Sequence, residues 1–253
     1  SIYGEGSLVD TERIDLPPEG DVVRIYPDIP SAGNHLRAEV RIVAGDAVDV
    51  FDIDDTAYAL LPEDRTTRVL LVTEGNLYLE GPFLLNESVE ATSITPEEYT
   101  AANAGDPSAD VDLTVFDQVA PPTAERGNFL YFAPEGEFSP WPVEGAVVDP
   151  IIDQIRTSHP LLSFVTSLRD LNIARAQRLE TSSDDTVVAR AIDGTPMIVV
   201  RDAIGGRRAA VAFDVTDSDL PLRVAFPVFL LNAIDWLTGV DTSLIDGVRT
   251  GEA

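Results

Sequence analysis

The chain has 253 residues, a formal net charge of −27 at pH 7 and no cysteine. Its 44 acidic residues outnumber 17 basic ones, and a field of that sign repels nucleic acid and anionic lipid, so neither is expected as a direct partner. The missing cysteine excludes disulfides, thiolate metal sites and a cysteine nucleophile. The length allows one large domain or two smaller ones.

The first 65 residues predict a small antiparallel β-domain. Short apolar runs alternate there with Pro and Gly, and in the run 35–43 the apolar residues at 36, 38, 40 and 42 fall on one face. Strands are expected at residues 7–16, 21–29, 35–43 and 56–61. Four strands are few for a closed sandwich, so residues 1–65 predict an incomplete β-sandwich-like domain.

From residue 66 the pattern changes to alternating strands and helices. Short apolar runs bounded by turn residues are typical of buried parallel strands, and their spacing is that of βαβ units. The sequence therefore predicts an α/β domain over residues 66–240, with a largely parallel, flavodoxin-like sheet flanked by helices. Residues 241–253 would form a tail leading to a further segment. The expected strands are 69–73, 89–94, 112–116, 128–132 and 208–213, and the expected helices are 77–85, 96–102 and 220–237.

Two stretches of this domain depart from the simple alternation. Residues 186–192 and 196–201 predict a hairpin across Asp193-Gly194. Residues 133–150 are rich in Pro, Gly and acidic residues and hold Trp141, which predicts a long surface loop or lid.

Polar residues follow three of the predicted parallel strands. Because such sheets bind ligands at the carboxyl ends of their strands, these residues predict a site for a cation or a polar ligand. The alternative is that Asp217, Ser218 and Asp219 cap the following helix while the others are solvated turn residues. The candidate ligand-binding residues are Glu74, Asn76, Asp117, Gln118, Asp214 and Asp217.

The densest acidic cluster lies in the first domain, and calcium is the cation that such closely spaced carboxylates would hold. The cluster lacks the Gly at the sixth position and the terminal Glu of an EF-hand loop, so turn hydrogen bonding is the favoured interpretation. No other cofactor is expected. The cluster comprises Asp46, Asp49, Asp52, Asp54 and Asp55.

The usual catalytic and nucleotide-binding motifs are absent from the sequence. His35 and His159 lie in different predicted domains, outside any HExxH spacing, and no GxSxG elbow accompanies them. His159 precedes Pro160 and an apolar run, which favours a structural hydrogen-bonding role over that of a base. No glycine-rich phosphate-binding motif is present, so nucleotide binding is not expected.

Several segments together carry a resemblance to a known family: VLLVTEGNLYLEGPFLL, ITPEEY, LTVFDQVAPP, NFLYFAP, SHPLL and AFDVTDSDLPLRVAFPVFLLNAIDWL. From about residue 47 onward the chain resembles bacterial membrane proteins that carry a von Willebrand factor A (VWA) domain, of the aerotolerance-operon, BatA-like type. In that family a VWA domain and a β-sandwich precede a domain similar to class I glutamine amidotransferases, and membrane helices flank the whole.

The resemblance implies an amidotransferase-like fold with a nucleophilic cysteine at a strand-to-helix elbow. Here the turn after the fourth strand reads Ala133-Pro134-Glu135-Gly136, with neither Cys nor Ser. We therefore expect no catalysis and an interaction or assembly domain on the extracytoplasmic side of a bacterial membrane, with protein partners that include its own VWA domain. The alternative is a hydrolase or ligand-binding module that uses carboxylates at the sheet rim.

The resemblance also places the VWA domain and the membrane anchors outside residues 1–253. Since the sequence begins with Ser1 and not with Met, we expect it to be a fragment of a longer protein.

Overall fold

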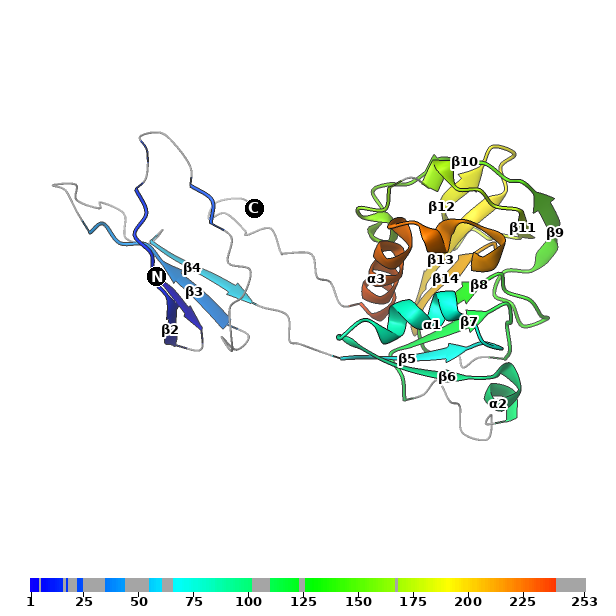
Figure 1. Ribbon diagram of the computed structural model, residues 1–253, viewed down its shortest axis with the longest axis horizontal. Coiled ribbons are helices and arrows are strands. Elements are labelled where there is room, and N and C mark those ends of the chain that lie inside the picture. Colours follow the sequence, from blue (N-terminus) through cyan, green and yellow to red (C-terminus); the bar gives the residue numbers. More distant parts are fainter. Residues whose placement is uncertain are drawn as a thin grey trace. The chain divides into compact units, whose positions relative to one another are not determined.

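The computed structural model divides into two compact units, residues 1–65 and 66–253, and each is described by itself (Figure 1). The residues that the structure describes are 1–4, 6–15, 17, 22–24, 35–43, 55–60, 66–101, 110–122, 126–166 and 168–239.

The first unit holds a four-stranded antiparallel sheet in the order β2-β1-β3-β4. Its strands are β1 (Ile2–Gly4), β2 (Ser7–Asp10), β3 (His35–Glu39) and β4 (Thr56–Leu60). Strand β1 is not predicted by the sequence, and most of the predicted strand 21–29 lies outside the described residues. Among the described residues of this unit only Gly4 is buried, and Val40 is 69% exposed, so the apolar face expected at residues 36, 38, 40 and 42 is not buried among them.

The second unit is built on an eight-stranded, mostly parallel sheet in the order β10-β12-β13-β14-β8-β7-β5-β6 (Figure 1). The parallel strands are β5 (Thr67–Val72), β6 (Val89–Ile94), β7 (Leu113–Asp117), β8 (Phe129–Phe132) and β14 (Gly206–Val211). The antiparallel extension is β10 (Ile152–Ile155), β12 (Asp185–Ala191) and β13 (Pro196–Ala203). The predicted α/β fold class and the predicted hairpin are both confirmed.

Three α-helices accompany the sheet in the described residues: α1 (Leu77–Leu84), α2 (Pro96–Ala101) and α3 (Ala225–Thr238). Helices α1 and α3 lie on one face of the sheet (Figure 1). Helix α2 starts with a capping box, because Glu98 N donates to Thr95 Oγ1 (3.2 Å) and Thr95 N donates to the Glu98 carboxylate (2.9 Å). Helix α3 ends at Gly239, whose φ of 72° suits glycine.

The chain enters α3 later than the sequence predicts. Residues Val215–Asp217 and Leu220–Leu222 form two 3₁₀ turns, and the helix begins only at Ala225. Asp219 therefore does not cap α3. It accepts hydrogen bonds from Asn172 N (3.1 Å) and Arg223 Nη2 (2.6 Å), and the hydrogen bond from Arg223 lowers its pKa to about 2.

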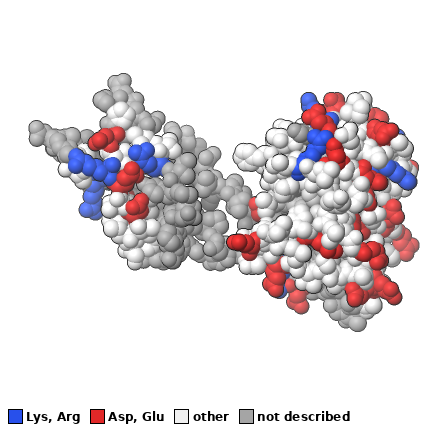
Figure 2. Space-filling view, in the orientation of Figure 1, with Lys and Arg blue, Asp and Glu red and all other residues white. Residues whose placement is uncertain are grey.

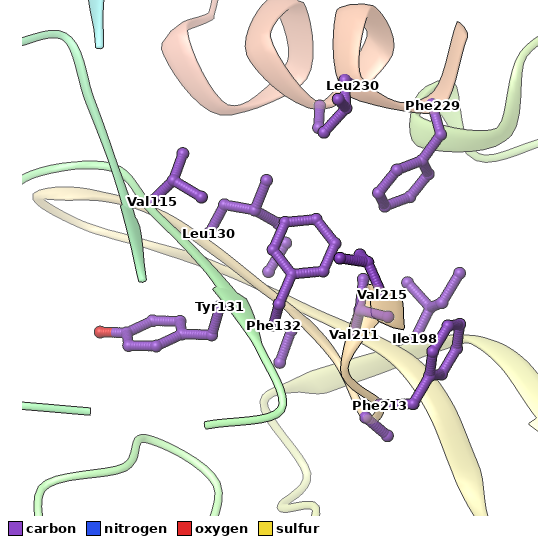
Figure 3. Close-up of a cluster of buried hydrophobic side chains, with 14 of the residues drawn as sticks. Val115, Leu130, Tyr131, Phe132, Ile198, Val211, Phe213, Val215, Phe229 and Leu230 are labelled. Carbon is purple, nitrogen blue, oxygen red and sulfur yellow. The ribbon is translucent and has the colours of Figure 1, made fainter. Parts of the chain in front are cut away.

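The core is organised around β8, which is buried on both faces. Leu130 and Phe132 point toward Phe229 and Leu230 of α3, whereas Tyr131 points to the opposite side (Figure 3). On that opposite side, the ring centroids of Tyr131 and Phe116 in β7 lie 5.0 Å apart in a stacked arrangement. Two-sided burial explains why the strand reads as a continuous apolar run.

Most of the segment 133–150 is exposed, as expected, but the expectation of an irregular surface loop fails at Trp141 and in the strand that follows it. Trp141 is fully buried, edge-on to Tyr131 with 6.2 Å between ring centroids, and covers the aromatic face of the sheet together with Tyr99 of α2. The Arg201 guanidinium lies 5.3 Å from the Trp141 ring centroid and donates to both Asp185 oxygens (2.8 and 3.1 Å).

A second part of the predicted lid forms a strand. Strand β9 (Val143–Val148) pairs antiparallel with β11 (Arg175–Leu179) in a separate two-stranded sheet. Neither strand is expected from the sequence, because β9 is largely exposed and β11 carries two arginines and a glutamine in five residues.

Gly206 provides a test of how closely the backbone packs at the start of β14. Its φ is 151°, and a Cβ at this position would lie 2.0 Å from the carbonyl oxygen of Gly127. We expect Gly206→Ala to lower the free energy of unfolding by about 3 to 5 kcal/mol, because backbone would have to move. Denaturant unfolding measures this change.

Gly194 is the matched control for that substitution. It lies in the hairpin turn at φ 88°, and a Cβ added there would meet nothing within 4 Å, so Gly194→Ala should cost only about 1 to 2 kcal/mol of backbone strain. Equal losses in the two variants would contradict the close approach.

Candidate functional site

The strand order reverses between β5 and β7. The chain passes from β5 to β6 on one side and then returns to place β7 on the other side of β5. In open α/β sheets, the crevice beyond the carboxyl ends of two such strands is the usual place for a ligand. Thr73 and Asn76 follow β5, and Asp117 is the last residue of β7, so three polar side chains meet at this point.

Asp117 is the centre of a buried polar cluster. Its Oδ2 accepts hydrogen bonds from Thr73 Oγ1 (2.7 Å) and from Asn76 Nδ2 (3.1 Å). Asn76 in turn accepts from Tyr78 N through Oδ1 (3.2 Å) and so caps α1. Asp117 thus fixes the end of β7 to the turn that starts α1, while its other oxygen, Oδ1, is buried without a hydrogen-bond partner.

Burial raises the pKa of Asp117 above its ordinary value, because desolvation disfavours the carboxylate. The hydrogen bonds from Thr73 and Asn76 oppose that effect, and the negative charge of Asp214, after β14, adds to it. Two carboxyl groups of the rim therefore interact electrostatically across the strand ends.

A cavity of about 650 Å³ lies beside this cluster, at the carboxyl ends of β7, β8 and β14, with β9 and β11 along its other side. Three acids and one arginine face it, so the lining is polar with an excess of negative charge. Gln177 Oε1 is buried there without a hydrogen-bond partner and offers an acceptor. The polar lining residues are Gln118, Glu135, Arg175, Gln177, Asp214 and Asp217.

The chain leaves two adjacent strands through residues in the left-handed region. Ala133 after β8 has a φ of 43°, and Gln118 after β7 has a φ of 59°. Such conformations cost non-glycine residues about 1 to 3 kcal/mol and often occur at functional sites. Ala133 stands where the amidotransferase-like resemblance implies a nucleophile, so the turn there has an elbow-like backbone and carries only a methyl group.

The structure brings most of the predicted rim residues together. Gln118, Asp214 and Asp217 line the cavity, and Asn76 bonds to Asp117, whereas Glu74 is exposed and does not line this cavity. Binding of a ligand by these residues stays a prediction. Sequence reasoning missed Thr73, although it ends a predicted strand, and it missed Arg175 and Gln177, because β11 gave no strand signal.

The other candidate residues lie elsewhere. Asp46, Asp49, Asp52 and Asp54 are outside the described residues, and no group of three metal-ligating side chains occurs in the part that is described, which includes Asp55.

The two histidines are not part of the rim site. His35 is exposed in β3. His159 Nδ1 accepts from Leu161 N (3.2 Å), its ring packs edge-on against Trp236 of α3, and burial lowers its pKa. These contacts give His159 the structural role that the sequence favours.

No protein-family model matches the chain, and no curated protein matches it either. Among solved structures it is similar to two cytoplasmic proteins of Salmonella typhimurium, STM3548 (9% identity, TM-score 0.53, covering 68% of this chain and 98% of that one) and STM1381 (12%, 0.53, 67% and 99%). A ThuA-like protein from Parabacteroides merdae aligns at 11% identity and a TM-score of 0.49, over 69% and 90% of the two chains.

The second unit has a class I glutamine amidotransferase-like fold, as the sequence resemblance implies. At these identities the likeness shows the fold alone. Within the described ranges, no helix combines the length and the apolar character needed to cross a membrane.

Asp117→Asn tests the electrostatics of the cluster. The pKa of Asp117 in the folded chain is raised above the ordinary value of 3.8, so ionisation of Asp117 at higher pH lowers the free energy of unfolding. Each pKa unit by which folding raises the pKa corresponds to about 1.4 kcal/mol. The free energy of unfolding of the variant minus that of the parent should therefore rise as the pH increases from about 4, and level off above the raised pKa. Urea unfolding at a series of pH values measures this difference.

The exposed Glu74 supplies the control, since Glu74→Gln should leave the shape of the pH profile unchanged. Parallel profiles for Asp117→Asn and the parent would show that the Asp117 pKa is not raised.

Proposed function

We propose that this chain is a non-catalytic interaction or assembly domain of a membrane-anchored VWA-domain protein, on the extracytoplasmic side of a bacterial cell membrane. The observation that carries the absence of catalysis is Ala133, a methyl-bearing residue in a left-handed turn at the end of β8. The VWA partner domain, the membrane anchors and the location rest on the sequence resemblance.

The cavity beside Ala133 supports the non-catalytic part of the proposal. None of the described residues that line it is Ser, Thr, Tyr, Lys or His. The described lining therefore offers no hydroxyl, amine or imidazole group for covalent attack. His159 is not among the lining residues and is engaged with Leu161 N. The lining can hold a polar or cationic ligand through its acids and through Gln177 Oε1, and among its described residues only those carboxylates could act as a nucleophile or a base.

A second function is favoured by Asp117 and Asp214. A buried carboxyl group with a raised pKa near a second carboxyl group is an arrangement that general acid–base catalysis uses. Against it, Asp117 is not among the cavity-lining residues, and its Oδ2 is occupied by Thr73 and Asn76. The hydrolase or ligand-binding function is therefore the runner-up.

The two functions differ in turnover. We expect the purified chain to hydrolyse neither p-nitrophenyl acetate nor γ-glutamyl p-nitroanilide above the buffer rate, since no attacking group lies at the elbow. Release of p-nitrophenol or p-nitroaniline, followed by absorbance, is the measurement. Turnover that Asp214→Asn removes, in a variant that keeps its circular dichroism spectrum, would overturn the proposal in favour of the hydrolase.

The cellular part is tested on the protein as its gene encodes it. We expect the full-length product to carry a VWA domain and at least one apolar span of about 20 residues, and to sediment with membranes. In intact spheroplasts, added protease should cleave the region described here. Recovery in the soluble fraction, or protection from protease until lysis, would contradict the membrane-anchored, extracytoplasmic placement.

A further inference from the structure

A groove of about 620 Å³ runs between α1 and α3, on the face of the second unit opposite the Trp141 layer. In Figure 2 the surface over these two helices is largely white, with acidic side chains and some basic ones toward its margin. The lining comes from α1, from the turn after it, from the 3₁₀ turn before α3 and from α3 itself. Its apolar members include Leu77, Leu85, Phe226, Leu230, Leu231 and Ile234.

Large apolar side chains stand exposed in and beside this groove. Leu77 is 83% exposed and Leu85 is 86% exposed, and both line it. Leu84, Leu222 and Val224, on the same elements, are exposed as well. A contiguous exposed apolar surface on an otherwise acidic protein marks an interaction site, because leaving it in water costs free energy that a partner would recover.

The charged lining of the groove is acidic. Glu87 is its only charged lining residue in the described part of the chain, and Glu80 lies on α1. No arginine lines it, and Arg223, which stands between Leu222 and Val224, is paired with Asp219 at 2.6 Å. The groove therefore combines an apolar floor with acidic residues of α1 and the turn after it that form no ion pair among the described residues, while the nearby arginine is held by an aspartate.

We propose that this groove binds an amphipathic α-helix of a partner protein, whose apolar stripe fills the groove and whose flanks are basic. The proposal rests on the proposed function, for which it supplies the contact surface and the chemistry of the partner. Two helices border the groove, and α3 has 14 residues, a length of about 20 Å. A partner helix of about four turns, with apolar residues at i, i+3, i+4 and i+7, matches that length.

The negative charge of the chain disfavours two other possible occupants of the groove. A second copy of this chain would bring another −27 to the contact, and an anionic lipid surface would be repelled in the same way. A basic-flanked helix instead gains from the same field, which raises its association rate and selects against acidic partners.

Gly81 allows the groove to be blocked without disturbing the core. It lines the groove within α1, and a Cβ added there meets nothing within 4 Å. Gly81→Phe places a ring in the space that the partner would occupy. Gly81→Ala adds only a methyl group at the same position before Pro82, so it is the matched control.

The experiment uses synthetic peptides of about 14 residues, acetylated, amidated and fluorescently labelled. One has leucines at i, i+3, i+4 and i+7 with lysine flanks, one has glutamate flanks, and one is a scrambled version of the first. Fluorescence anisotropy should show saturable binding of the lysine-flanked peptide, with the other two at least tenfold weaker. Raising the salt from about 50 to about 500 mM should weaken binding, because charge contributes.

Substitutions locate the binding. Gly81→Phe and Leu85→Asp should each weaken the lysine-flanked peptide at least tenfold, and Gly81→Ala should not. Ile204→Asp is the control for a new acidic charge, since Ile204 is a fully exposed apolar residue in the β13–β14 turn, outside the groove. Sedimentation equilibrium of the parent chain and of Leu85→Asp is run alongside.

Three results would overturn the proposal: no saturable binding up to about 1 mM peptide, equal binding of the scrambled peptide, or binding that the groove variants leave unchanged. Self-association that Leu85→Asp abolishes, without peptide binding, would assign the groove to a second copy instead. These outcomes are independent of the turnover assay, because neither Gly81 nor Leu85 lines the rim cavity. Failure of the groove and failure of the non-catalytic assignment can thus be told apart.

Discussion

Burial of β7 and β8 on both faces is the constraint from which the rest of the second unit follows. Each strand presents apolar side chains in both directions, so each face needs a covering layer. Helix α3 covers Leu130 and Phe132 on one face. On the other, α2 supplies Tyr99 and the segment after β8 supplies Trp141. The groove and the rim cavity lie at the edges of these two layers.

The sequence predicted those parts of the fold in which the buried residues form a regular pattern along the chain. The parallel strands, the three helices and the β12–β13 hairpin lie close to their expected positions, because apolar runs with Gly, Pro or Asn at their ends mark them. The sequence did not predict β9, β10 or β11, which are partly exposed and mix polar with apolar residues. The burial of Trp141 was also missed, since the residues that it contacts include Arg201, 60 residues later in the chain.

The candidate site was predictable to a similar degree. The rule that strand ends share one edge places Asn76 beside Asp117, and the structure brings them to 3.1 Å. It gives no account of Gln177, which reaches the cavity from an unpredicted strand, or of Ala133, whose left-handed φ depends on how the chain leaves β8. The α1–α3 groove depends on how two helices are placed in space, which periodicity does not specify.

The left-handed turn at Ala133 keeps its backbone hydrogen-bonded. Its N–H donates to Val211 O (2.9 Å), and Gln118 N, at the other left-handed residue, donates to Phe132 O (2.8 Å). Each of these two residues thus adds one further backbone hydrogen bond between neighbouring strands before the chain leaves the sheet. A bend that satisfies the backbone in this way needs no reactive side chain, so a sharp turn at a strand tip is not in itself a sign of an enzyme.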